Sequence, residues 1–262
     1  MAAAALDGTG SADRRNIVIR FFVLNWGILL ILVAWEGWVA ANDFNPIVMP
    51  SPQGVFMDMV SNPGIYVENT SVTLFVAAVG LAGGLAVGTG LAILTWFSPV
   101  LSGLVSPTAV LFSSVPVVSL IPIIARILGY NMATEIAIVV IITFFPSFVF
   151  TTAGLRDLPH GSQDLFSVLG ASRRATLRRL ALPAAVPNMA IALRLAAAHA
   201  ILAAMIAEFL MGTTGLGYLF AVTKQEFLTE RAFGTSVVAT AISVAAFLAT
   251  SHLERRIRAR FT

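Results

Sequence analysis

The stretch LGASRRATLRRLALP, residues 169–183, concentrates charge in an otherwise apolar chain. It holds four of the sixteen Lys and Arg residues in a 262-residue sequence that is 58% hydrophobic and only 11% charged. A soluble domain of this length has about a quarter of its residues as Asp, Glu, Lys and Arg. Half that charge, with long apolar runs and a mean hydropathy of +0.89, predicts that lipid is the main solvent of this chain.

Charge pattern and residue usage exclude several classes of function. The pI is about 9.9, but the net charge is only +3 and the basic residues lie at the ends of apolar segments, which is typical of membrane proteins and not of nucleic-acid-binding proteins. The absence of cysteine excludes disulfides, a thiol nucleophile and cysteine metal sites. There is no P-loop sequence and no Ser/His/Asp set, carboxylate pair or His cluster placed for chemistry. We therefore expect no catalytic, cofactor-binding or metal-binding residues in this chain.

Six apolar segments predict an all-α integral membrane protein with one transmembrane domain over residues 20–252. A helix needs roughly 20 apolar residues to cross a hydrocarbon core of about 30 Å. Basic residues precede the first segment, as in a signal peptide, but its apolar run exceeds the usual length of about 7–15 residues, so we expect a retained helix. The predicted spans are 20–41, 70–97, 100–129, 132–153, 189–211 and 233–252.

The cations predict the orientation of these spans. With both termini in the cytoplasm, that side holds twelve arginines, whereas the outer side keeps Lys224, Arg231 and, near its boundary, Arg126. This asymmetry follows the positive-inside rule. Residues 1–19 and 253–262 are then cytoplasmic tails, and residues 157–188 form a cytoplasmic loop.

Glycine spacing in the second span predicts a close helix contact. Gly80, Gly84 and Gly88 lie on one helical face, which lets a neighbouring helix approach its backbone. The nearby Gly88-Thr89-Gly90 run is not interpreted as a nucleotide-binding loop, because no strand precedes it.

The loop of residues 157–188 has the pattern of two short helices. The first is expected over 159–169 with Pro159 in its first turn, and Gly170 permits a left-handed turn at its end. Ser172 is expected to cap a second helix that ends at Leu182-Pro183. One face is apolar and one basic, as in a docking element. The alternative is that the arginines only fix topology and contact anionic lipid headgroups.

The spacing within this loop resembles the EAA loop of bacterial ABC importer permeases, E-A-A-x3-G-x9-I-x-L-P. Gly170 is followed after nine residues by Leu180-Ala181-Leu182-Pro183, and the E-A-A positions hold Asp164-Leu165-Phe166. The bulkier residues at the two alanine positions depart from the pattern. Over about residues 45–260, the chain is similar to the nitrate/sulfonate/taurine-type branch of these permeases, through MPSPQGV, LGASRR, LPAAVPN, LRLA, AEFL and GLGYL.

This resemblance implies a type I ABC importer permease in the bacterial cytoplasmic (inner) membrane. Such a subunit pairs with a second copy of itself to line one pathway, and it binds two ABC ATPase subunits that hold ATP and Mg. A periplasmic or lipid-anchored solute-binding protein delivers the solute. The residues that the resemblance assigns to ATPase coupling are Asp164, Leu165, Phe166, Leu169, Gly170, Ala171, Ser172, Arg173, Arg174, Leu180, Leu182 and Pro183.

The same resemblance places candidate pathway or gate residues in three segments. Pro116 and Pro122 suit a span that bends beside the pathway. Glu208 is costly in a span, and we expect a structural or gating role at the dimer interface, with substrate contact or interfacial exposure as alternatives. Gly215 and Gly217 belong either to a short outer gate helix or to a tight glycine turn.

Two further charged residues receive simpler interpretations. Arg194 is expected to extend its side chain to the membrane interface, and Glu135 to be solvated near the outer face.

The solute is expected to be small: an oxyanion, a sulfonate, taurine or a similar compound. The alternative solute is a vitamin-related heterocycle, such as a pyrimidine precursor or a riboflavin-like molecule. A stand-alone secondary transporter would instead have ionisable groups near the bilayer midplane and no docking loop.

Overall fold

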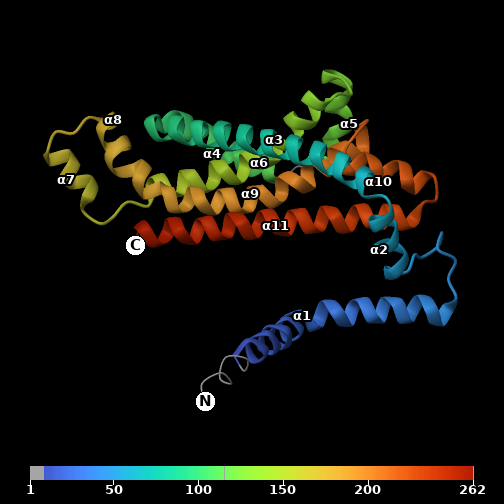
Figure 1. The fold of residues 1–262 in the computed structure, drawn as a ribbon. Coiled ribbons are helices and arrows are strands. Elements are labelled where there is room, and N and C mark those ends of the chain that lie inside the picture. Colours follow the sequence, from blue (N-terminus) through green and yellow to red (C-terminus); the bar gives the residue numbers. More distant parts are fainter. Residues whose placement is uncertain (1–8, 115, 262) are drawn as a thin grey trace, which may run out of the picture.

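The computed structural model of the protein describes the backbone of residues 9–114 and 116–261, and the side chains of residues 26–109 and 116–261. All regular structure within these ranges is helical, which confirms the predicted fold class (Figure 1). The helices are α1 (Thr9–Asn42), α2 (Pro52–Ser61), α3 (Pro63–Phe97), α4 (Pro99–Ser114), α5 (Val117–Leu128), α6 (Met132–Arg156), α7 (Ser162–Val168), α8 (Arg173–Thr176), a π-helical segment (Leu177–Ala181), α9 (Leu182–Met211), α10 (Leu216–Gln225) and α11 (Thr229–Phe261).

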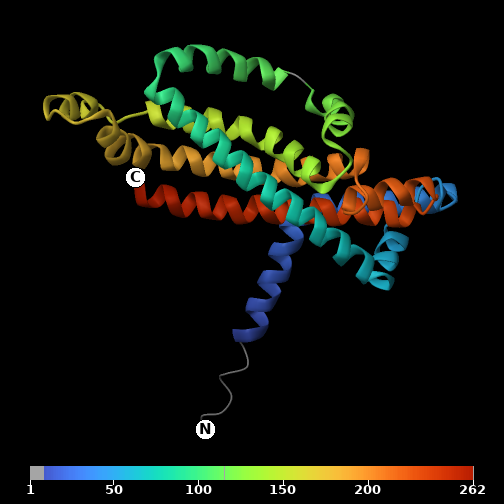
Figure 2. The same cartoon turned by 90° about the horizontal axis from the view of Figure 1, so that it is seen from above.

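Four long helices, α3, α6, α9 and α11, lie side by side and form the bundle (Figures 1 and 2). Among the described residues, the segments long and apolar enough to cross a membrane are Pro63–Phe97, Met132–Arg156, Arg173–Met211 and Thr229–Phe261. The protein is therefore a multi-pass membrane protein, while the count of six spans stays a prediction. The loop end of the bundle holds α7, α8 and the C-terminus, and the distal end holds α2, α5 and α10 (Figure 1).

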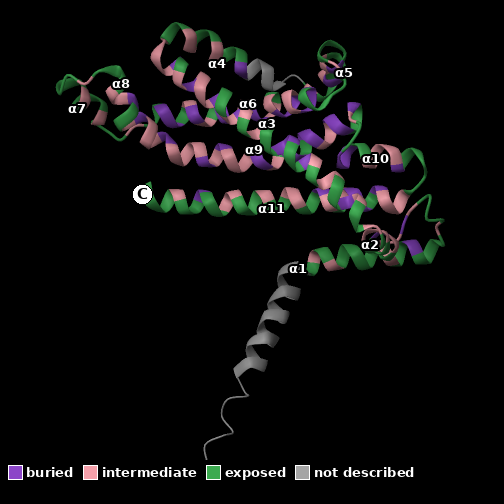
Figure 3. Cartoon of the chain, turned by 45° about the horizontal axis from the view of Figure 1, so that its top comes forward, coloured by how far each residue is buried: buried purple, intermediate pink, exposed green. Residues whose placement is uncertain are grey.

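Small residues set the spacing at the centre of the bundle. The buried residues of α9 are mostly alanines, and Ala200 and Ala204 pack with Val76 of α3 and Val139 of α6. Figure 3 shows the buried positions where these helices face one another, and exposed or half-buried positions on their outer sides. Exposed apolar side chains such as Phe75 suit contact with lipid acyl chains.

The predicted glycine contact joins α3 to α6. A Cβ atom added at Gly88 would lie 2.6 Å from the Cβ atom of Ser147, and one added at Gly83 would lie 2.8 Å from a methyl group of Val140. Gly80 and Gly84 face Val139 and Thr143 in the same way. The close approach predicted from the spacing of the glycines is confirmed.

Residues 100–129 form two helices rather than the single bent span predicted from sequence. Pro107 is accommodated inside α4 and Pro122 inside α5, but Pro116 has extended backbone angles (φ −70°, ψ 93°) and stands before α5 as its cap. Proline has no N–H to donate to a preceding turn, so the helix stops there. Figure 2 shows α4 and α5 set off from the long helices.

Candidate functional site

The EAA-like loop, residues 157–188, begins with a helix flanked by two glycines in the left-handed region. Gly161 (φ 73°) precedes α7 and Gly170 (φ 66°) follows it. Glycine adopts this conformation without the steric cost that a Cβ atom brings. Ser172 then caps α8, because its Oγ accepts a hydrogen bond from the N–H of Ala175 at 3.3 Å. The turn and the cap were both predicted, but α7 starts at Ser162, three residues later than expected.

The second half of the loop continues into α9 without a break. The prediction that Leu182-Pro183 ends the second short helix is therefore wrong. The N–H of Leu182 donates to the carbonyl of Leu177, five residues earlier. Pro183 has no N–H, and its ring crowds the carbonyl four residues before it. The wider π turn of Leu177–Ala181, immediately before the proline, gives the ring room.

The apolar side chains of the loop divide between two surfaces. Leu165, Val168 and Leu169 are 56%, 86% and 72% exposed, and α7 projects beyond the ends of the long helices (Figure 1). Leu177 is buried and Leu182 packs against the same cluster, at the loop end of the bundle. The exposed α7 patch, defined as Leu165, Val168 and Leu169, is therefore available to a partner, while the later leucines anchor the loop.

Sequence reasoning missed Val168, although its spacing of three from Leu165 places both on one side of a helix. Of the other residues assigned to coupling, Asp164, Ser172, Arg173 and Arg174 are exposed, and Phe166, Ala171, Leu180, Leu182 and Pro183 are half-buried.

Two arginines at the loop end donate hydrogen bonds to other helices of the chain. Arg173 Nη1 donates to the carbonyl oxygen of Phe97, the last residue of α3, at 2.9 Å. Arg156 Nη2 donates to the Ser102 hydroxyl at 2.6 Å. Arginine near the last turn of a helix binds carbonyls that have no partner within that helix. These bonds attach the loop and the end of α6 to α3 and α4.

At the distal end, Glu208 holds the turn that starts α10. Its Oε2 accepts hydrogen bonds from the Thr73 hydroxyl and from the N–H of Gly217, both at 2.9 Å. The N–H of Leu216 donates to Thr73 Oγ1 at 2.9 Å, and the N–H of Gly215 donates to Asn69 Oδ1 at 3.0 Å. We call residues 212–217 the distal turn. Gly215 has φ 98° and forms a turn, whereas Gly217 lies inside the short helix α10, so both local structures occur here and the gate role stays a prediction.

Glu208 is fully buried within one copy of the chain. It has a structural role in the distal turn, while its place at an interface between copies stays a prediction, and its Oε1 has no hydrogen-bond partner among the described residues. Glu135 is only 3% exposed, so the expectation of a solvated residue near the outer face is wrong. A Cβ atom added at Gly212 would lie 3.0 Å from Glu135 Oε1 and 2.7 Å from the Glu208 backbone, which places both acids beside the distal turn.

The two proline positions assigned to the pathway belong to α5 and its cap, and α5 packs against the end of α9 that precedes this turn. Pro116 and Pro122 are exposed, whereas Ile121 of α5 is fully buried in a cluster that includes Ala207 and Met211 of α9. The structure thus brings α5, the end of α9 and the distal turn together. It separates them from the EAA-like loop by the length of the bundle (Figure 1).

Arg194 makes an ion pair that sequence analysis did not predict. Its Nη1 lies 2.9 Å from Glu254 Oε2 on α11, and its guanidinium carbon lies 5.6 Å from the centre of the Phe247 ring. Arg258 Nε is 3.1 Å from the other oxygen of Glu254. The nearly buried carboxylate of Glu254 is therefore paired with two cations, and the pair joins α9 to α11.

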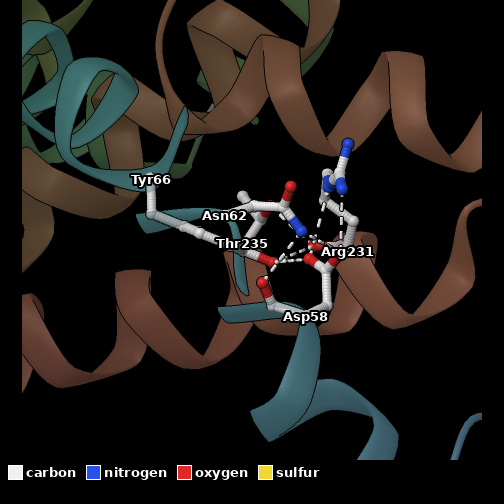
Figure 4. Close-up of polar contacts among 5 residues, drawn as sticks. All are labelled: Asp58, Asn62, Tyr66, Arg231 and Thr235. Carbon is white, nitrogen blue, oxygen red and sulfur yellow. Dashed lines mark hydrogen bonds and ion pairs between the residues drawn. The ribbon is translucent and has the colours of Figure 1, made fainter. Parts of the chain in front are cut away.

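A second ion pair joins α2, α3 and α11 at the distal end (Figure 4). Arg231 Nη2 donates to Asp58 Oδ1 at 2.8 Å, and the Tyr66 hydroxyl donates to Asp58 Oδ2 at 2.6 Å. Asn62 donates to Asp58 Oδ1 at 3.0 Å. Burial raises the pKa of the Asp58 carboxyl, but the hydrogen bonds from Arg231, Tyr66 and Asn62 and the charge of Arg231 outweigh it, so that the pKa lies below its usual value.

Comparison with known proteins agrees with the arrangement of the helices. A probable ABC transporter permease protein of Haemophilus influenzae is 29% identical, over 88% of this chain and 93% of its own. The formylaminopyrimidine transport permease protein ThiX of Halalkalibacterium halodurans is 28% identical, over 86% of this chain and 90% of its own. The taurine transport system permease protein TauC of Escherichia coli is 24% identical, over 85% and 81%.

The fold is also that of solved transporters. A chain of the MetNI methionine ABC transporter in an inward-facing conformation superposes with a TM-score of 0.65 at 17% identity, covering 74% of this chain and 96% of that one. At this identity, the likeness concerns the fold alone. Residues 80–259 match the family described as the binding-protein-dependent transport system inner membrane component. The chain belongs to this family and is the inner-membrane permease component of an ABC importer.

Proposed function

We propose that two copies of this chain form the translocation pathway of an ATP-driven importer, and that the α7 patch is where each copy binds an ATPase subunit. A solute-binding protein would deliver a small solute to the distal end. ATP would be bound and hydrolysed on the partner subunits, since we expect no nucleotide site in this chain. The observation that carries the proposal is the exposed apolar α7 patch on a helix that projects beyond the bundle.

The physical argument for a docking role is that this patch lies away from the apolar spans. Leu165, Val168 and Leu169 are exposed at the loop end, and Arg174 and Arg178 of the same loop are exposed as well. Exposed apolar side chains rimmed by charge mark interaction surfaces. The buried Leu177 and the continuous helix into α9 hold α8, which follows the patch in sequence, against the bundle.

The test is co-purification of the ATPase subunit with Val168→Asp, which places a charge at the most exposed position of the patch. Because Val168 is 86% exposed, the chain should fold normally and bind at least about tenfold less ATPase, as a central interface position loses 2 kcal/mol or more. Ala259→Asp is the matched control, since it adds the same charge at an exposed position of the loop end on α11. Equal ATPase recovery with both variants would disprove the docking role of α7.

Two classes of solute fit the relatives. The first is an oxyanion, alkanesulfonate or taurine, as in the names of TauC and of the putative aliphatic sulfonates permease SsuC of Bacillus subtilis, which is 23% identical. The second is a vitamin-related heterocycle, as in the names of ThiX and of the riboflavin permease RibX of Chloroflexus aurantiacus, which is 27% identical. Identity to ThiX, at 28% over 90% of its length, favours the second class.

The described distal end carries charges of both signs. Arg231 is paired with Asp58, and the acids Glu135 and Glu208 are buried beside the distal turn, whereas Arg126 of α5 and Lys224 of α10 are exposed. Uptake by proteoliposomes that contain the assembled importer and its binding protein, with taurine and formylaminopyrimidine as competing labelled solutes, separates the two classes.

A further inference from the structure

The two ends of α3 are bonded to the two parts of the chain that have candidate roles. At the loop end, Arg173 at the start of α8 donates to the carbonyl of Phe97 at 2.9 Å. Phe97 closes α3, and the last carbonyls of a helix carry the negative end of its dipole without an intrahelical partner. A guanidinium therefore suits this position, and it fixes the first turn of α8 to the end of α3.

At the distal end, side chains from α3 and α9 cap α10. The first N–H groups of a helix have no partner within that helix. Here Gly215, Leu216 and Gly217 donate in turn to Asn69, Thr73 and Glu208. Asn69 and Thr73 belong to α3, and the carboxylate of Glu208 on α9 also accepts a hydrogen bond from the Thr73 hydroxyl. The start of α10 is thus held by neighbouring helices and not by its own turn.

Between these ends, α3 packs closely against α6. Cβ atoms added at Gly80, Gly84 or Gly88 would collide with α6, and Ser147 Oγ donates to the Leu85 carbonyl at 3.2 Å. Ridges packed this closely resist sliding, because any shift brings backbone atoms into contact. The 28 helical rises from Asn69 to Phe97 span about 42 Å at 1.5 Å each, which is the distance over which the two ends are joined.

We propose that α3 carries movement of the EAA-like loop to the distal turn, and that Thr73 and Glu208 are positioning residues that make α10 move with α3 as one body. The proposal rests on the proposed function, in which the ATPase subunits supply the movement. A route through α9 alone is the competing arrangement, since α9 is continuous with the loop and carries Glu208. Thr73 and Asn69 distinguish the two, because both lie on α3.

The absence of cysteine permits a direct distance measurement in the full-length importer. Spin labels are attached at Val67→Cys on α3 and Lys224→Cys on α10, both exposed positions. The distance is measured without nucleotide and with ATP trapped by vanadate. We expect one narrow distribution with the same mean in both states. A change in the mean distance on nucleotide trapping would overturn the movement of α10 and α3 as one body.

Thr73→Val tests the positioning residues in the same labelled background. Valine keeps the shape but removes the hydroxyl that bonds both Glu208 and Leu216, so the distribution should widen by about twofold through loss of both bonds. Ser71→Ala is the control, because the Ser71 hydroxyl is exposed and bonds only the carbonyl of Glu68 in its own helix. An unchanged width with Thr73→Val would refute the positioning role, whether or not ATPase subunits bind.

Arg173→Gln tests the loop end of α3. We expect ATPase subunits to co-purify with this variant, but solute taken up per ATP hydrolysed should fall about fivefold, since coupling between sites is commonly worth that factor. Arg255→Gln is the control, because Arg255 is an exposed arginine of α11 at the same end. Its uptake of solute per ATP hydrolysed should equal that of the native protein. Loss of ATPase binding would count against Arg173 as a transmitting contact, and failure of the native chain to bind ATPase would refute the proposed function instead.

Discussion

Replacing single glycines of α3 with alanine tests how much the α3–α6 contact depends on close approach. Gly88 and Gly90 lie two residues apart in the same helix. A Cβ atom at Gly88 would lie 2.6 Å from Ser147 Cβ and 2.7 Å from the Phe144 carbonyl oxygen, whereas nothing lies within 4 Å of one at Gly90. Gly90→Ala therefore reports the change in helix propensity alone, and Gly88→Ala reports the same change plus the collision.

The magnitudes follow from these contacts. Alanine is favoured over glycine in a helix interior by about 0.5–1 kcal/mol, so Gly90→Ala should stabilise the protein slightly. An added methyl group in a packed contact costs about 1–3 kcal/mol, and a backbone carbonyl cannot move aside as a flexible side chain does. The two variants should therefore differ by about 2 kcal/mol, with Gly88→Ala less stable.

The assay is thermal unfolding of the purified subunit in detergent, with native protein and both variants scanned at one rate because membrane proteins often unfold irreversibly. A difference of about 2 kcal/mol corresponds to about 4–8 °C for a domain of this size. Equal midpoints for Gly88→Ala and Gly90→Ala would refute the close packing of α3 on α6, and with it the rigid connection between the two ends of α3.

Three further outcomes are expected. Asp58→Asn should lower the free energy of unfolding by about 2–3 kcal/mol near pH 7. Because the pKa of Asp58 in the folded protein lies below its usual 3.8, the stabilisation by the Asp58 carboxylate is present above pH 3.8 and is lost as the pH falls through the folded pKa. The melting temperatures of the native protein and the variant should therefore converge in acid. Arg194→Gln should lower the melting temperature, since Glu254 keeps a nearly buried charge, and Glu254→Gln in the same chain should restore part of the loss. Gly170→Ala should destabilise the turn between α7 and α8 by about 1–2 kcal/mol, because Gly170 has φ 66°, and it should therefore reduce co-purification of the ATPase subunit.

Features that depend on the stereochemistry of one or two residues were predictable from sequence. The left-handed turn at Gly170 and the Ser172 cap follow from local backbone requirements. The close contact through Gly80, Gly84 and Gly88 follows from their spacing on one helix. The spacing does not predict that α6 is the partner helix. The apolar spans follow from length and hydropathy in the same way.

Burial of individual charged residues was not predictable, because it depends on which helices meet. Glu135 is close to the end of its helix in sequence, a position that suggests solvation, but α9 and the distal turn cover it. Arg194 lies one to two helical turns from the predicted membrane interface. Its ion-pair partner, Glu254, belongs to α11, so the pair depends on how α9 and α11 pack together. A carboxylate in lipid needs a partner, but the partners here lie on helices far away in the sequence.

The Leu-Pro pair of the EAA-like loop shows how a residue that breaks helices can instead join them. The sequence pattern predicts a stop at Pro183, and a stop would leave a flexible connection between the loop and the bundle. The π turn over Leu177–Ala181 removes the clash, so α8 and α9 form one continuous helical rod from Arg173 to Met211. A movement of α8 then has two rigid recipients: α9 through its covalent continuation, and α3 through Arg173. Both recipients meet again at the distal turn, where Glu208 of α9 and Thr73 of α3 share a hydrogen bond, so the turn receives the movement of both helices together.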